Sequence, residues 1–163
     1  EEVAATSPAR VCLLAPRVLS GMAREGALKL MEITAGRVVA IAETFLGLRH
    51  GPMAFLTPQT DILYFFSSDP LVRRYELDLA RDVRAKELAL SSVALGPEHE
   101  AQAKYSLATA CRDPVPDVFR APLDVVFPQM LALFLCIRLG LRPDEPSEAG
   151  VIHRVVQGVR IYS

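Results

Sequence analysis

The chain has 163 residues, of which 51% are hydrophobic and 23% charged, and its formal net charge at pH 7 is −1. This length and composition are typical of one folded domain with a sizeable core and exclude an intrinsically disordered chain. Because the net charge is close to zero and no basic block is present, the electrostatic pattern of nucleic-acid-binding proteins is absent, and we expect no nucleic-acid partner.

Short apolar runs alternate with helical segments along the chain. The runs are rich in aliphatic, β-branched or aromatic residues, as in buried parallel strands, and we predict strands at 9–16, 37–44, 61–68, 87–96 and 104–110. Helices are predicted at 20–36, 69–86 and 116–141. Strands that alternate with helices predict an α/β domain with a parallel sheet covered on both faces.

The ends of the predicted helices carry recognisable signals. Ser20 is expected to cap the first helix and Gly36 to end it. Asp69 is expected to cap the second helix, with Pro70 at its first position. Internal prolines are expected to kink the third helix.

The α/β domain is expected to span residues 9–141. Residues 1–8 are interpreted as an N-terminal edge or linker, and residues 142–163 as a C-terminal tail that packs on the domain or on a partner. Within the tail, "VVQGVRIY" has the composition of a further edge strand. The chain begins with Glu1 and not with Met, so we expect further sequence upstream.

Cysteines and apolar stretches bear on the cellular compartment. The cysteines are scattered without CxxC spacing, which favours buried, reduced thiols in a cytoplasmic protein; they are Cys12, Cys111 and Cys136. The longest apolar stretch, residues 125–141, is interrupted by proline, glutamine and arginine. It is therefore predicted to be a buried helix and not a membrane span, and no signal peptide is recognisable.

Ligands of open parallel sheets bind beyond the carboxyl ends of the strands, which selects residues 16–21, 45–53 and 67–69 as candidate sites. Ser67 and Ser68 precede a helix and are able to hold a phosphate. Asp69 would repel that anion, so ordinary helix capping is favoured at this position.

Three charged residues share one face of the first predicted helix. Glu25, Lys29 and Glu32 are spaced i, i+4 and i+7, which places them in a narrow row. From composition alone, a solvent-facing salt-bridge stripe is the favoured interpretation. The alternative is a carboxylate–ammonium–carboxylate row that faces a cleft and moves protons.

His50 lies in "LRHGPMAFL", between Gly47 and the apolar segment after Pro52. It is either a structural turn residue or an acid/base that titrates near neutrality. His99 is expected at the surface, and His153 lies in the tail. The histidines lack metal-ligand spacing, and no dinucleotide, P-loop or serine-hydrolase fingerprint occurs. We therefore expect no metal and no cofactor.

Several segments together resemble one family. "MAREGALKLMEITAG", "LRHGPMAFL", "SSDPLVRRYELDL" and the ending "LGLRPDEP…HRVVQGVRIY" resemble the C-terminal half of sugar isomerase (SIS) domain proteins of the tagatose-6-phosphate ketose/aldose isomerase-like group. "EGALKLMEI" followed by "RHGP" is also similar to the isomerase domain of glucosamine-6-phosphate synthase. The resemblance covers residues 10–162.

The resemblance implies a flavodoxin-like, three-layer αβα sandwich with a five-stranded parallel sheet. It also implies a phosphosugar isomerase or an amino-sugar-phosphate deaminase-isomerase that acts on a hexose 6-phosphate by enediol proton transfer. At the matching positions, Glu32 would move the proton, Lys29 would assist at the sugar and His50 would open the ring. Glu25 matches a further acidic site residue.

Gln157 and Ser20 are assigned to substrate binding, at two places where this sequence departs from the pattern of the SIS relatives. Gln157 stands where the synthase has a tail lysine that enters the site. The Ser/Thr-rich phosphate loop of the first SIS half has no counterpart here, and Ser20 is the serine at the entry to the first helix. For the isolated chain, this absence favours the alternative function, a non-catalytic phosphosugar-binding or regulatory module.

The resemblance also implies assembly. We expect a homo-oligomer or a second SIS half as the partner, with His50 at an SIS–SIS boundary and the row Glu25–Lys29–Glu32 lining the adjoining cleft.

Overall fold

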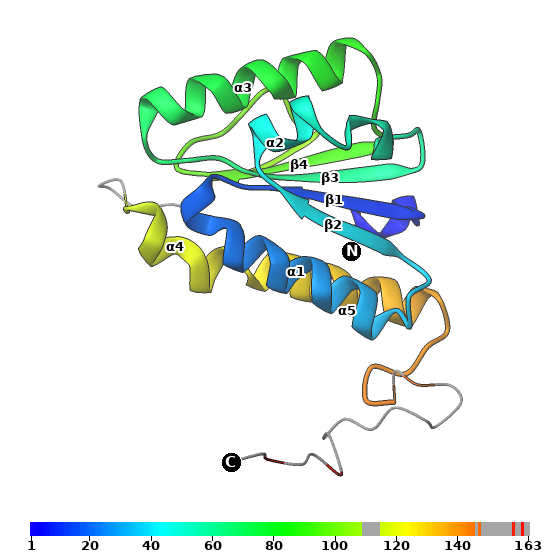
Figure 1. Cartoon of the computed structure of the whole chain (residues 1–163). Coiled ribbons are helices and arrows are strands. Elements are labelled where there is room, and N and C mark those ends of the chain that lie inside the picture. The colour runs from blue at the N-terminus through cyan, green and yellow to red at the C-terminus, as the bar shows by residue number, and fades with distance from the viewer. Residues whose placement is uncertain (109–114, 146, 148–157, 159–160, 162–163) are drawn as a thin grey trace.

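The structure is a computed structural model that describes residues 1–108, 115–145, 147, 158 and 161. At its centre is a five-stranded sheet in the order β2-β1-β3-β4-β5, in which every neighbouring pair is parallel (Figure 1). The strands are β1 (Arg10–Leu14), β2 (Val39–Glu43), β3 (Thr60–Phe65), β4 (Ser91–Gly96) and β5 (Tyr105–Ala108). The prediction of a five-stranded parallel sheet is confirmed.

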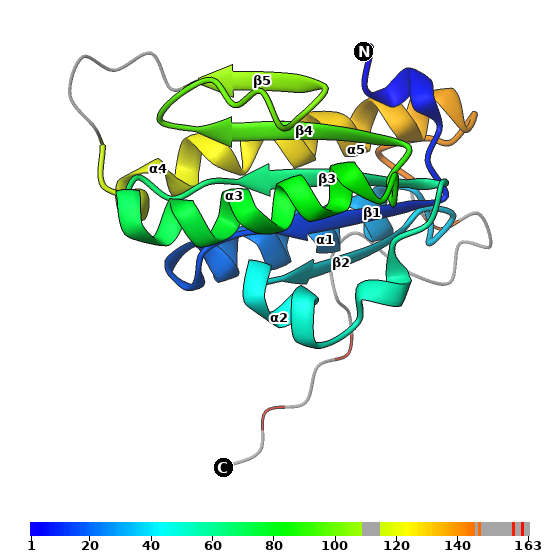
Figure 2. The ribbon, with the colours of Figure 1, turned by 90° about the horizontal axis from the view of Figure 1, so that it is seen from above.

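Helices cover both faces of the sheet (Figures 1 and 2). One layer contains α1 (Ser20–Ile33), α4 (Asp117–Asp124) and α5 (Val126–Arg138), and the other contains α2 (Phe45–His50) and α3 (Pro70–Ala85). Short 3-10 turns are η1 (Ala4–Thr6), η2 (Arg17–Leu19) and η3 (Met53–Phe55). The architecture is the expected three-layer αβα sandwich.

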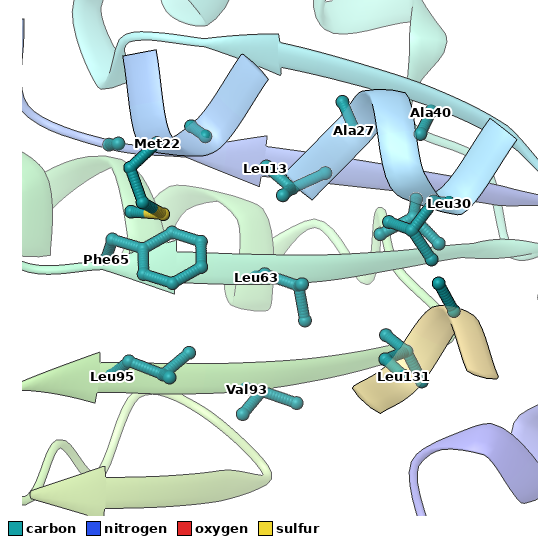
Figure 3. Close-up of a cluster of buried hydrophobic side chains, with 14 of the residues drawn as sticks. Leu13, Met22, Ala27, Leu30, Ala40, Leu63, Phe65, Val93, Leu95 and Leu131 are labelled. Carbon is teal, nitrogen blue, oxygen red and sulfur yellow. The ribbon is translucent and has the colours of Figure 1, made fainter. Parts of the chain in front are cut away.

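Two hydrophobic clusters fill the spaces between the layers. Successive strand residues point to opposite faces, so Leu13 and Leu63 pack towards α1 and α5 (Figure 3). Leu14 and Ile62 pack towards α2 and α3 on the other side. Because both sides of the central strands are buried, their sequences are almost continuously apolar and do not alternate.

The helix predicted at 116–141 is two helices that meet at Val125. Pro122 lies inside α4, and Pro128 occupies the first turn of α5, where its missing N–H leaves no helical hydrogen bond unmade. By length and composition, the segment Asp117–Arg138 could cross a membrane, with a mean hydropathy of 1.5. Only 33% of that apolar window is buried.

The capping predictions have different outcomes. The Asp69 side chain accepts hydrogen bonds from the N–H groups of Leu71 and Val72, and Pro70 begins α3, as expected. Gly36 adopts a φ of 73° and its N–H donates to Met31 O, which ends α1. The Ser20 cap is wrong: Ser20 is already the first residue of α1, because η2 runs directly into the helix.

The two ends of the chain extend the α/β core differently. In residues 1–8, Ala4 is buried and the Thr6 hydroxyl donates to Asp61 Oδ2 at 2.6 Å, so this segment packs on the domain. Most of residues 142–163, including the predicted edge strand, lies outside the described residues.

Candidate functional site

The row Glu25–Lys29–Glu32 lies on the solvent side of α1. Lys29 Nζ is 2.7 Å from Glu32 Oε2 and 3.8 Å from Glu25 Oε1, and the side chains are 32%, 49% and 41% exposed respectively. The hydrogen bond with Glu32 raises the pKa of Lys29, so the ammonium stays charged at neutral pH. Within this domain, the ion-paired stripe predicted from the spacing is therefore present.

The inner face of α1 holds this row in place. Met22, Ala27 and Leu30 point into the core beneath the helix (Figure 3). Gly26 allows the close approach of α5, since a Cβ atom there would lie 2.7 Å from Pro128 Cγ. The position of the row is thus fixed by packing against β1 and α5.

His50 is the last residue of α2, and it is exposed. The interpretation of His50 as a turn residue is wrong, because Thr44 caps a short helix that contains Gly47 and ends at His50. Pro52 directly precedes the short turn η3. Phe45 and Leu48 anchor α2 in the core and leave His50 at the surface.

The structure does not bring His50 and the row together within this domain. The row belongs to α1, which packs on the cluster that contains Leu13, whereas His50 belongs to α2, which packs on the cluster that contains Leu14. The sheet lies between the two helices (Figure 1).

The remaining predicted site residues are scattered. Ser20 is half-buried at the start of α1, after the carboxyl end of β1. His99 is exposed, as expected. Gln157 and His153 lie outside the described residues.

A buried polar network at the carboxyl end of β3 was not predicted. Asp117 accepts hydrogen bonds from the hydroxyls of Ser67 and Ser68, both at 2.6 Å, and from Ser68 N at 2.7 Å. Arg120, 1% exposed, donates to Asp117 at 3.2 Å and to Asp124 at 2.9 Å. These contacts hold α4 at the carboxyl end of β3, and the hydroxyl groups of both serines are engaged in them.

One sequence signal does point to this network. Asp117, Arg120 and Asp124 follow an i, i+3, i+7 spacing in an apolar helical region, which places three charges on one helix face. Burial raises the pKa of Asp117, but the hydrogen bonds from Ser67 and Ser68 outweigh this effect and lower it. The carboxylate is therefore held in its charged form.

Glu76 adjoins the same network from α3. Its Oε2 accepts a hydrogen bond from Ser67 N at 2.8 Å, while its buried Oε1 has no hydrogen-bond partner. Burial raises the pKa of Glu76 from 4.5 to about 7. Glu76 also lines a cavity of about 310 Å³ beyond the carboxyl ends of β1 and β2, together with Arg17, Thr44 and Tyr75.

Metal-binding groups and thiols are placed as follows. No group of three His, Cys, Asp or Glu side chains within the described residues has the geometry to hold a metal ion. Cys12 and Cys136 are buried free thiols, and Cys111 lies outside the described residues.

Sequence comparisons identify relatives of this chain. No protein-family model matches it. A relative from Streptomyces coelicolor is 39% identical over 163 residues, which is 96% of this chain and 41% of the relative. The D-galactosamine-6-phosphate deaminase of a Shewanella species is 37% identical over 153 residues, 94% of this chain and 37% of that protein. The chain thus spans about two fifths of the length of the curated relatives it matches.

Solved structures share the fold. A crystal structure from Clostridium novyi superposes with a TM-score of 0.89 at 31% identity, over 99% of this chain and 43% of that one. Tagatose-6-phosphate ketose/aldose isomerase from Escherichia coli superposes with a TM-score of 0.81 at 29% identity, over 96% of this chain and 44% of that one. By sequence and by fold, the chain is a sugar isomerase (SIS) domain.

Proposed function

We propose that this domain carries the proton-transferring carboxylate of a phosphosugar isomerase or an amino-sugar-phosphate deaminase-isomerase. The observation that carries the proposal is the row on α1, where the Lys29 ammonium lies 2.7 Å from the Glu32 carboxylate. The names of the relatives, a galactosamine-6-phosphate deaminase and a tagatose-6-phosphate isomerase, support a hexose 6-phosphate as the substrate.

Glu32 acts as the base and then as the acid on the opened sugar. Its carboxylate accepts the proton from the carbon beside the carbonyl, which leaves an enediolate, and the carbonyl oxygen then takes up a proton to give the enediol. The carboxyl of Glu32 returns its proton to the former carbonyl carbon, while the neighbouring hydroxyl loses its proton and becomes the new carbonyl. Aldose and ketose are thereby interconverted with no gain or loss of atoms. For a 2-amino sugar, the same transfer gives an imine, which water hydrolyses to the ketose and ammonia.

Lys29 assists Glu32 by stabilising charge. Its ammonium, held beside Glu32, is available to polarise the sugar oxygen on which negative charge develops. Glu25, Ser20 and Gln157 are proposed to contact the substrate. Because a positioned carboxylate suffices for the proton transfer, the proposed reaction requires no metal or redox cofactor.

His50 is proposed to open the sugar ring as an acid/base, in an active site to which another subunit or SIS half contributes the row. The placement of α1 and α2 on opposite faces of the sheet supports this arrangement. The partners are thus a phosphorylated sugar and a second SIS domain, in the same chain or in a homo-oligomer. Metabolic relatives of this kind support a cytoplasmic location.

Turnover by the complete protein tests the proposal. The protein is incubated with galactosamine 6-phosphate and with tagatose 6-phosphate, and ammonia and the isomerised sugar are measured separately. Release of ammonia with the first substrate indicates a deaminase-isomerase, and isomerisation alone indicates an isomerase. No turnover of these or of other hexose 6-phosphates would overturn the proposed activity.

The alternative is a non-catalytic module that binds a phosphosugar for regulation. Binding of a hexose 6-phosphate without turnover, measured by calorimetry, would support it. A helix-turn-helix segment upstream of Glu1 would point the same way, whereas an upstream SIS half with a Ser/Thr-rich loop would favour the enzyme.

A further inference from the structure

The cavity of about 310 Å³ beyond the carboxyl ends of β1 and β2 has no part in the proposed reaction. Helices α2 and α3, which cover the same face of the sheet, supply part of its wall (Figure 1). Neither His50 nor the row Glu25–Lys29–Glu32 lines it. Open parallel sheets bind ligands beyond the carboxyl ends of their strands, so the position of this cavity is that of a ligand site.

The lining of this cavity is mostly apolar. Pro16 follows β1, Phe45 and Leu46 belong to α2, and Val72 and Tyr75 belong to α3. Pockets for small molecules are typically apolar, with a few polar groups that fix the orientation of the ligand. Aromatic rings carry negative potential on their faces, so the presence of Phe45 and Tyr75 favours a cationic ligand over an anionic one.

Glu76 is the acidic residue of the lining, and it is 3% exposed. Its Oε2 accepts a hydrogen bond from Ser67 N at 2.8 Å, whereas Oε1 has no hydrogen-bond partner within the described part of the chain. Because buried polar atoms are nearly always paired, a carboxyl oxygen left without a partner at a cavity points to a missing donor. Arg17 also lines the cavity, but it is exposed, so solvent screens its charge.

We propose that this cavity binds a small organic ammonium ion with an apolar body, whose N–H group donates a hydrogen bond to Glu76 Oε1. The apolar wall covers the body of the ligand, and the carboxylate balances its charge. A phosphate or a carboxylate ligand is disfavoured, because it would bring a second negative charge to a buried carboxylate. An alcohol offers a donor but no counter-charge, and hydrogen bonds between two charged groups are the stronger ones.

The affinity of this site for an ammonium ion should depend on pH. Burial raises the pKa of Glu76 to about 7, and four neighbouring groups have smaller effects: the Ser67 N–H, Asp117, Arg73 and Arg120. The ligand requires the charged carboxylate, so below pH 7 the proton of Glu76 must leave before the ligand binds. We therefore expect the affinity to fall by roughly tenfold for each pH unit below about 7 and to change little just above it.

An NMR titration of the complete protein with n-butylammonium chloride tests the proposal, and n-butanol serves as an uncharged probe of similar size. At pH 8 we expect n-butylammonium to bind more tightly than n-butanol by about tenfold or more. Glu76→Gln should remove this preference and the pH dependence. Glu98→Gln is the matched control, because the Glu98 side chain is 68% exposed and does not line the cavity, and it should bind both probes as the unmodified protein does.

A second variant places the binding in the cavity even if Glu76→Gln does not fold. Val72 lines the cavity and is 40% exposed, so Val72→Trp fills the cavity without altering Glu76 and should weaken the binding of n-butylammonium. Binding that Val72→Trp leaves unchanged would overturn the proposal, as would equal affinity for the two probes, no binding of either, or an affinity that stays constant from pH 5 to 8. Binding does not depend on turnover, so an inactive protein that binds n-butylammonium would contradict the proposed function and leave this site standing.

Discussion

Two charged clusters in this domain differ in depth and in sequence separation. The row Glu25–Lys29–Glu32 lies within one helix, and its side chains are 32% to 49% exposed. The network around Arg120 joins β3 to α4, and the Arg120 side chain is 1% exposed. Exposed ion pairs contribute little to stability, whereas a broken buried pair is costly. The network therefore stabilises the fold, whereas the row contributes little to stability and is available for a catalytic role.

Removal of the buried arginine should have the largest effect. Arg120→Met leaves Asp117 and Asp124 buried without their cation, so we expect the free energy of unfolding to fall by about 3–5 kcal/mol. Urea denaturation of the variant and of the unmodified protein measures the difference. Arg81→Met is the matched control, because the Arg81–Asp78 pair is exposed, and its cost should be below about 1 kcal/mol. An equal loss of unfolding free energy in the two variants would contradict the distinction between buried and exposed ion pairs.

The pH dependence of stability should reveal Glu76. Its pKa in the folded state is about 7, raised from 4.5, so the folded state binds this proton more tightly than the unfolded state does. The resulting stabilisation, on the order of 3 kcal/mol, is fully present below pH 4.5 and is lost as the pH rises through 7.

The variant Glu76→Gln removes this titration. The free energy of unfolding of the variant is subtracted from that of the unmodified protein at each pH from 4 to 8. This difference isolates the contribution of Glu76, because the other carboxyl groups with shifted pKa values are present in both proteins: Asp61, Asp117 and Asp124. The difference should fall with rising pH between the two pKa values. A difference that stays constant over this range would show that Glu76 is not held in its protonated form.

A smaller loss is expected where α1 approaches α5. Gly26→Ala would place a Cβ atom 2.7 Å from Pro128 Cγ and 2.8 Å from Leu13 Cδ2, and overpacking of this kind costs about 1–3 kcal/mol. Gly21→Ala in the same helix is the control, because a Cβ atom there meets nothing within 4 Å. Thermal unfolding should separate the two variants, and similar melting temperatures would mean that the contact with α5 does not hold the row in place.

Local patterns in the sequence predicted the sheet, the termini of α3 and the row. "ARVCLLAP" and "DILYFFSS" are apolar because β1 and β3 are buried on both faces, and the row appears because its members are only seven residues apart. The network was missed because Ser67 and Asp117 are fifty residues apart, a separation that no helical or strand period links. Helix α2 was missed because Gly47 and "HGP" resemble loop residues, although Thr44 caps the helix and Phe45 anchors it.

Local sequence patterns also do not predict where His50 lies relative to the row. Their sequence separation is short, but β2 runs between α1 and α2 and the chain crosses to the other face of the sheet. Only the topology shows that His50 and the row lie on opposite faces of the sheet of this domain.

The variant Glu32→Gln tests the central claim most directly. It is nearly isosteric and removes only the base, so the complete protein should keep its free energy of unfolding within about 1 kcal/mol. Its kcat/KM on the hexose 6-phosphate that it turns over should fall by about 10²–10⁴-fold. Asp78→Asn, which breaks a similarly exposed pair on α3, should leave kcat/KM unchanged. Full activity in Glu32→Gln would contradict the account and make the row an ordinary surface ion pair.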